Sequence, residues 1–76
     1  MTFPTIEQAV RYRLGLYLDA LDDEPPKDVL RMVIDAVERP VLEMMLEHAG
    51  GNQALAAEYL GISRPTLRAK LQHRGT

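Results

Sequence analysis

Close to the carboxyl end of the chain, basic and hydroxyl side chains occur at the spacings of a short helix. The basic residues are Arg64, Arg68 and Lys70, and the hydroxyl residues are Ser63 and Thr66. An arginine can bond the O6 and N7 atoms of guanine with two parallel hydrogen bonds, and Arg64 is well placed for that contact. Hydroxyl groups reach base edges or nearby phosphates, and cationic side chains neutralise phosphates. These residue types in this order favour binding to double-stranded DNA.

Two short helices joined by a tight turn would position these side chains. The first is predicted over residues 52–60, because the side-chain oxygen of Asn52 can accept a hydrogen bond from an unpaired amide at its start. Gly61 follows, and glycine takes the left-handed conformation that ends a helix without a β-carbon clash. Ala57 is small enough to let a second helix cross the first steeply. This stretch therefore predicts a helix that stops at a turn.

The second helix is predicted over residues 63–73. Ser63 is a candidate cap, and Pro65 falls in the first turn, where a missing N–H costs nothing. Leu67 and Leu71 form one apolar stripe. Two such helices make a helix-turn-helix, whose second helix lies in the major groove with its first side chains at the base edges. An ordinary helical hairpin with a solvated basic face fits the spacing alone about equally well, but the density of matching features favours DNA binding.

The charge of the chain is divided unevenly along its length. Residues 1–49 carry five basic residues against ten acidic ones, a balance of −5, within a chain whose net charge is −2. Residues 50–76 carry four basic residues against Glu58 alone, a balance of +3. An acidic body with a basic end is typical of a protein that approaches phosphates with one face. Chance clustering in a short chain is the alternative explanation.

Two further helices are predicted upstream. The first spans about residues 5–21, where Thr5 and Gln8 fit a capping box. The second spans about residues 27–49 and contains Pro40. Acidic residues and prolines between the two helices predict a loop. The second helix is apolar over most of its circumference, so it must be buried on several sides. The predicted fold class is all-α, with four helices.

A chain of 76 residues rarely builds a sufficient core alone. We therefore expect the two N-terminal helices to form an intertwined core between two chains related by twofold symmetry. Residues 1–49 would supply the dimerisation helices and residues 50–76 the helix-turn-helix, within one cooperative domain. The predicted dimer core consists of Leu14, Leu18, Val33, Ile34, Val37, Val41, Leu42 and Met45.

Several classes of protein are disfavoured by the sequence. The absence of cysteine excludes disulfides and thiolate metal sites, and no apolar run approaches the ~20 residues that cross a bilayer. His48 and His73 lack neighbouring ligands, so no metal site is expected. No glycine-rich phosphate loop, serine elbow or catalytic carboxylate pair occurs. We expect a soluble intracellular protein that is not an enzyme and has no cofactor or small-molecule ligand.

Several short motifs carry a family resemblance. In order and spacing, they are GNQ, AA, LGISR, TLR and KL, all after position 50. They resemble the C-terminal DNA-binding unit of the Fis family. The same unit forms the C-terminal domain of many bacterial enhancer-binding activators of the NtrC type. Residues 37–44 are similar to the long Fis helix with its internal proline. The resemblance extends from about Thr5 to the end of the chain.

The resemblance implies a homodimeric DNA-bending protein that acts in transcription regulation and in the bacterial nucleoid, in the cytoplasm. Its paired recognition helices would read a degenerate inverted repeat, and an A/T-rich centre would be favoured because it deforms readily. Arg64 would contact guanine, while Asn52, Arg68 and Lys70 would hold phosphates. The full set of expected DNA-binding residues is Asn52, Ser63, Arg64, Thr66, Arg68, Lys70, His73 and Arg74.

The sequence departs from the family pattern at several positions. The family often has asparagine at Ser63, and Ala69, Gln72 and His73 stand where stronger members carry basic residues. Affinity and its salt dependence should therefore be lower. The N-terminal arm that contacts recombinases in longer Fis proteins has no counterpart in this sequence. Two alternatives stay open: a helical dimer that serves as a protein-interaction module with little DNA affinity, or a C-terminal piece of an enhancer-binding activator.

Overall fold

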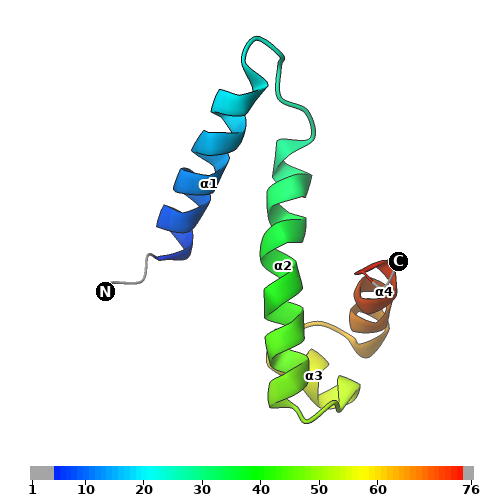
Figure 1. Cartoon of the computed structure of the whole chain (residues 1–76). Helices are drawn as coiled ribbons and strands as arrows, with labels where there is room; N and C mark the ends of the chain where they lie inside the picture. Colours follow the sequence, from blue (N-terminus) through cyan, green and yellow to red (C-terminus); the bar gives the residue numbers. More distant parts are fainter. Residues whose placement is uncertain (1–4, 75–76) are drawn as a thin grey trace. The chain divides into compact units, whose positions relative to one another are not determined.

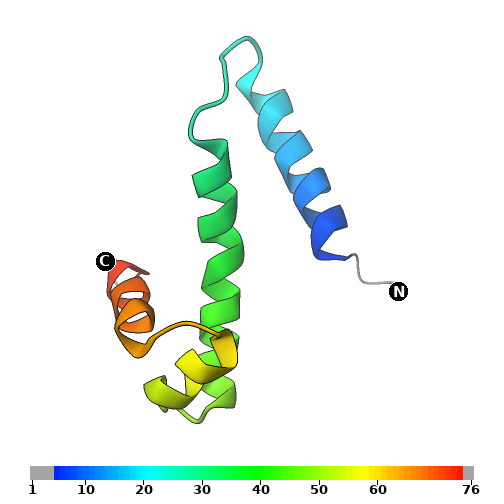
Figure 2. The same ribbon diagram turned by 180° about the vertical axis from the view of Figure 1, so that it is seen from behind.

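The computed structural model describes residues 5–74, with side chains described for residues 5–72. Four helices follow one another along the chain, as the front and rear views show (Figures 1 and 2): α1 (Ile6–Leu21), α2 (Val29–His48), α3 (Gln53–Leu60) and α4 (Arg64–Arg74). No strand occurs in these residues, so the prediction of an all-α fold with four helices is confirmed. The chain forms two compact units, divided within α2 after Val33.

The first unit contains α1, whose start is fixed by the expected capping box. The hydroxyl of Thr5 accepts a hydrogen bond from the Gln8 amide at 3.1 Å, and the Gln8 side chain accepts one from the Thr5 amide at 2.9 Å. Both reciprocal bonds satisfy donors that the first turn of a helix leaves unpaired. The helix ends at Leu21, and Asp22 departs from helical geometry with φ 59°. No residue of α1 is buried.

Helix α2 begins two residues later than the predicted start at residue 27. Asp28 has φ 50°, outside the right-handed helical region, and its carbonyl accepts the first helical bond, from the Met32 amide at 3.1 Å. Pro40 lies inside the helix without ending it. The chain then leaves α2 through Gly50 and Gly51, which both have positive φ. The predicted loop after α1 is therefore slightly longer than expected and the predicted long helix slightly shorter.

The second unit is built on a small apolar core. Leu67 is fully buried at 0% exposure, and Leu42 exposes only 2% of its surface. Buried alanines on α3 let α3 and α4 approach each other closely. Leu42 was predicted in the dimer core, but its surface is already covered by its own chain. The buried residues are Leu42, Ala49, Ala56, Ala57 and Leu67, and partly buried Leu46, Leu55, Leu60, Ile62 and Leu71 pack against them.

Candidate nucleic-acid interface

The turn between α3 and α4 has the geometry expected from its sequence. Gly61 takes the left-handed conformation with φ 77°, and its amide donates to the carbonyl of Ala57 at 2.9 Å. The amide of Ile62 donates to the same carbonyl at 3.1 Å. These bonds satisfy the last carbonyls of α3 and reverse the chain within a few residues. Helix α4 therefore begins close to the end of α3 and crosses it over the buried alanines.

Each helix of this pair begins at a side-chain cap. The Oδ1 atom of Asn52 accepts a hydrogen bond from the Leu55 amide at 3.1 Å, which caps α3. The Ser63 hydroxyl accepts one from the Thr66 amide at 3.2 Å and donates one to the Thr66 hydroxyl at 2.8 Å. In the free protein these three polar side chains therefore stabilise helix starts, which is the role that serine and asparagine commonly have there.

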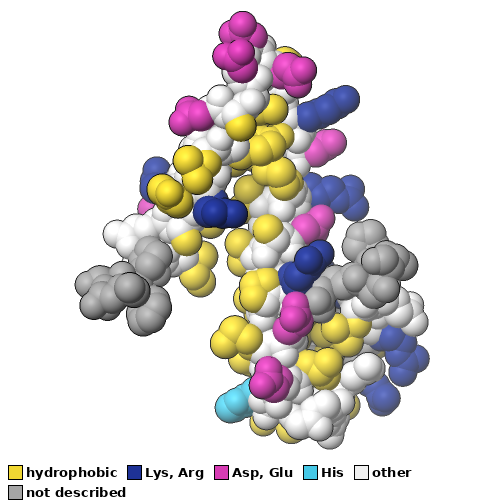
Figure 3. Space-filling view, in the orientation of Figure 1, with side chains coloured by type: hydrophobic (Ala, Val, Ile, Leu, Met, Phe, Trp, Pro, Cys, Tyr) yellow, Lys and Arg dark blue, Asp and Glu magenta, His cyan; other side chains and the backbone are white. Residues whose placement is uncertain are grey.

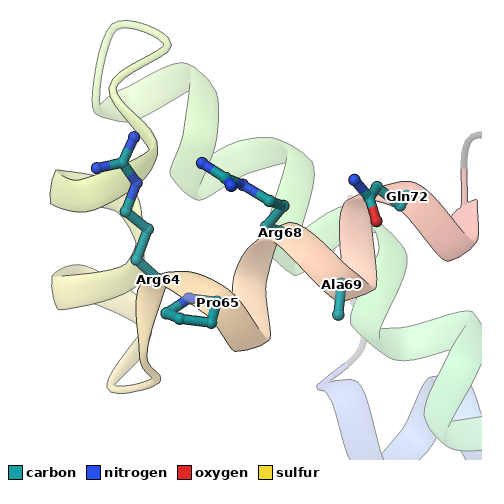
Figure 4. Close-up of a pocket in the computed structure, with 5 residues that line it drawn as sticks. All are labelled: Arg64, Pro65, Arg68, Ala69 and Gln72. Carbon is teal, nitrogen blue, oxygen red and sulfur yellow. The ribbon is translucent and has the colours of Figure 1, made fainter.

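The exposed side of α4 forms a shallow groove of about 360 Å³, shown in Figure 4. Arg64, Arg68 and Gln72 follow one another at intervals of four residues, so they form one row along the helix. Figure 4 shows the two arginine side chains extending from the same side of α4. We call this set of groove residues the recognition face; it consists of Arg64, Pro65, Arg68, Ala69 and Gln72.

Pro65, Ala69 and Gln72 were not among the predicted DNA-binding residues. In the sequence, Ala69 and Gln72 were noted only as positions where stronger family members carry basic residues, and Pro65 was given a role only in the first turn of the helix. The interval of four residues from Arg64 through Arg68 to Gln72 was the signal that could have found the row.

Lys70 does not share the recognition face. Its Nζ atom lies 2.5 Å from the Oε1 atom of Glu38 on α2, and its side chain is only 38% exposed. The predicted contacts His73 and Arg74 belong to α4, but their side chains lie outside the described residues. The structure thus brings Arg64 and Arg68 together and leaves Lys70 on another side of the helix.

The local charge of this region is positive. Helix α4 contains no acidic residue. Dark blue side chains project from the second unit where α4 begins in Figure 3, whereas acidic side chains gather at the loop that follows α1. A surface of this sign attracts polyanions and repels basic partners.

Other kinds of site find no support in the described part of the chain. Residues 5–72 contain no group of three histidine, aspartate or glutamate side chains that could hold a metal ion. Across the same described region, no helix combines the length and the apolar character that a membrane crossing requires. The recognition face is the candidate site.

A capped helix, a glycine turn and a second helix with an exposed basic row define a helix-turn-helix protein. Comparison with known proteins narrows this class. Residues 33–73 match the family model described as "Bacterial regulatory protein, Fis family". The chain belongs to the Fis family.

Relatives in other bacteria match nearly the whole chain. A Fis-like DNA-binding protein of Ralstonia nicotianae is 53% identical over 92% of this chain and 91% of its own length. A Fis-like DNA-binding protein of Neisseria meningitidis serogroup B is 42% identical over 97% of this chain and 94% of its own. The DNA-binding protein Fis of Haemophilus influenzae is 39% identical over 99% of this chain and 76% of its own. The similarity therefore includes α1 and α2 as well as the helix-turn-helix.

Proposed function

We propose that this chain is a homodimeric DNA-binding protein that bends its site and regulates transcription in the bacterial nucleoid. The observation that carries this proposal is the row of Arg64 and Arg68 on the exposed side of α4, in a chain of the Fis family. The role is one of binding alone and includes no catalytic step. The proposed location is the bacterial cytoplasm, where the chromosome is.

Helix α4 is the proposed recognition helix. Arg64 is its first residue, and the first residues of a recognition helix meet the base edges of the major groove. Its guanidinium can bond guanine bidentately, while Arg68, one turn later, is in reach of a phosphate. Ser63 and Thr66 keep the start of the helix in place through their mutual hydrogen bond. Asn52 caps α3, whose first amides can face another phosphate.

The proposed dimer rests on the apolar side chains that α1 and α2 leave exposed. Ile6 exposes 72% of its surface and Leu30 73%, and yellow hydrophobic side chains cover parts of both helices in Figure 3. Apolar area of this extent favours association, because its removal from water is the main driving force of burial. A second copy of the chain carries the same surface and can cover it symmetrically. The large side chains concerned on the two helices are Ile6, Tyr12, Leu16, Leu18, Leu30, Met32, Ile34, Val41 and Met44.

Two recognition helices in one dimer would read two half-sites of an inverted repeat. In the Fis family, the resemblance implies, these helices are too close for successive major grooves of straight DNA. The duplex must then bend, and its central minor groove must narrow. A/T-rich centres would be preferred because deforming them costs less free energy, not because their bases are contacted.

Fluorescence anisotropy can test this proposal with two duplexes. One carries outer G·C pairs around an A/T-rich centre, and the other carries the same outer pairs around a G/C-rich centre. We expect tighter binding to the first duplex, with an affinity that falls as salt rises. Energy transfer between dyes on the two duplex ends measures the bend, and sedimentation measures whether the bound species contains two chains.

A pair of arginine variants identifies the contact residue. Arg64→Ala removes the proposed base contact and should weaken binding to the A/T-centred duplex by about tenfold to a hundredfold. Arg13→Ala makes the same chemical change on exposed α1 and should leave the affinity close to that of the unmodified protein. Equal effects of the two changes would contradict the proposed recognition face. A folded dimer that binds neither duplex at low salt would favour the protein-interaction module instead.

A further inference from the structure

An ion pair connects the proposed recognition helix α4 with α2. The Nζ atom of Lys70 and the Oε1 atom of Glu38 are 2.5 Å apart, and their side chains expose 38% and 28% of their surfaces. The resemblance assigns Lys70 to a phosphate of DNA. In this structure the same ammonium group already has an anionic partner within its own chain.

The position of Lys70 on α4 separates it from the recognition face. Lys70 follows Arg68 by two residues, and at about 100° per residue the two side chains leave the helix on nearly opposite sides. Arg68 lines the exposed groove, whereas Lys70 is partly buried. The side of α4 that carries Lys70 is therefore not the side that carries the arginine row.

The ion pair extends an apolar contact by one helical turn. Glu38 precedes buried Leu42 by four residues on α2, and Lys70 follows buried Leu67 by three residues on α4. Residues at these intervals lie on the same side of a helix. Leu42 and Leu67 belong to one core cluster, so the ion pair lies at the rim of the contact between α2 and α4.

We infer that Glu38 is a positioning residue for DNA recognition, which acts by holding Lys70. Apolar packing is non-directional, so the contact through Leu67 leaves α4 some freedom to rotate about its axis. A charged hydrogen bond at the rim has a defined direction and restricts that rotation. The orientation of the Arg64 and Arg68 side chains toward DNA then depends on Glu38, which does not itself contact DNA. This inference rests on the proposed DNA-binding function.

The alternative is that Lys70 leaves Glu38 when DNA binds and contacts a phosphate. Glu38 would then compete with DNA, and its removal would strengthen binding. The two roles of Glu38 thus predict changes of opposite sign. Simple electrostatics also predicts stronger binding after loss of an acid, so a weakened variant cannot be explained by net charge.

The first experiment measures affinity for the A/T-centred duplex by fluorescence anisotropy at several salt concentrations. We expect Glu38→Gln to weaken binding about two- to fivefold, the range for loss of a partly exposed ion pair. Glu47→Gln removes an exposed acid from the same helix and serves as the matched control. It should not weaken binding. Lys70→Met should weaken binding as Glu38→Gln does, with an unchanged dependence on salt.

Two results of this experiment would overturn the inference. One is tighter or unchanged binding by Glu38→Gln. The other concerns the slope of log affinity against log salt concentration. A slope for Lys70→Met that is shallower by about 0.9 for each protomer would be the signature of one lost phosphate contact. Absence of binding by the unmodified protein would instead refute the proposed function.

A second experiment, without DNA, tests whether Glu38 and Lys70 are coupled in the folded protein. Urea unfolding of Glu38→Gln, Lys70→Met and the double variant forms a double-mutant cycle. We expect the double variant to have nearly the midpoint of the less stable single variant, because either change already breaks the ion pair. Fully additive shifts of the midpoint would show that the two residues are not coupled, and the inference would be wrong.

Discussion

Leu67 offers a direct test of the core that positions the recognition helix. It is the largest side chain that is fully buried, with 0% of its surface exposed. Its neighbours in the cluster include Ala49, Ala56 and Ala57, whose single methyl groups have no rotamers with which to fill a space. The change Leu67→Ala therefore removes the central apolar contact between α4 and the rest of its unit.

The expected loss of stability follows from the lost burial and from the cavity. Removal of buried apolar groups costs about 0.8 kcal/mol for each methylene, or roughly 2.5 kcal/mol for the groups that separate leucine from alanine. The remaining cavity adds about 1 to 1.5 kcal/mol where neighbours cannot collapse into it. The free energy of unfolding should thus fall by about 3.5 to 4 kcal/mol. A small domain has only about 5–15 kcal/mol in total, so this loss is a large fraction of the stability of the fold.

Urea unfolding followed by circular dichroism measures this loss. Gln72→Ala shortens an exposed side chain on the same helix and should change the free energy of unfolding by less than about 0.5 kcal/mol. Both variants must be compared at one protein concentration, because the stability of a dimer depends on it. A loss below about 1 kcal/mol for Leu67→Ala would refute the reasoning, since a centrally buried leucine cannot be removed so cheaply.

Variants at four further positions test local features by their unfolding free energies, melting temperature or assembly state. Gly61→Ala should lower the free energy of unfolding by about 1 kcal/mol, because φ at this position is +77°. The new β-carbon would meet nothing within 4 Å, so the loss comes from the backbone conformation alone. An unchanged free energy in urea unfolding would contradict this. Asn52→Ala should cost about 1 kcal/mol, since it removes the cap of α3, and Asn52→Ser should retain most of the stability. Asp22→Gly should raise the melting temperature, because φ 59° suits glycine; a lower value would be contrary evidence. Val37→Asp should sediment as an unfolded monomer, because the new carboxylate would lack a partner in the proposed dimer core. A folded monomer would contradict that core.

Local signals were sufficient to predict the helices. Thr5, Asn52, Ser63 and Gly61 act through neighbours a few residues away, so their caps and turn could be predicted from spacing alone. The start of α2 was missed although Asp28, a residue type that is common just before a helix, directly precedes it. Asp28 takes a positive φ there, which aspartate tolerates but which its sequence neighbours do not require.

The site was less predictable, because it depends on how helices pack. From the sequence, Arg68 and Lys70 had the same expected role as phosphate contacts, and only tertiary contacts could separate these two residues. Glu38 lies on another helix, far from Lys70 in sequence, and no local pattern connects the two. Leu42 likewise belongs to an apolar pattern that serves two different surfaces of α2, and the sequence could not assign it to its own chain's core.

These contacts also explain how a chain of net charge −2 can bind a polyanion. The potential that a phosphate meets is set by the nearest charges, because interactions beyond the Debye length of ~8 Å are largely screened in physiological salt. The residues of α4 itself, none of them acidic, therefore dominate the potential that a phosphate meets at this helix. If Glu38 neutralises Lys70, however, the positive charge of α4 is concentrated on the side that carries Arg64 and Arg68. A smaller number of cations, all on the side that faces DNA, would lower the affinity for non-specific DNA more than the affinity for a specific site. Base contacts do not depend on the number of phosphates neutralised, whereas non-specific binding does. A member of the family with few basic residues could then keep its discrimination between sites while releasing non-specific DNA more readily.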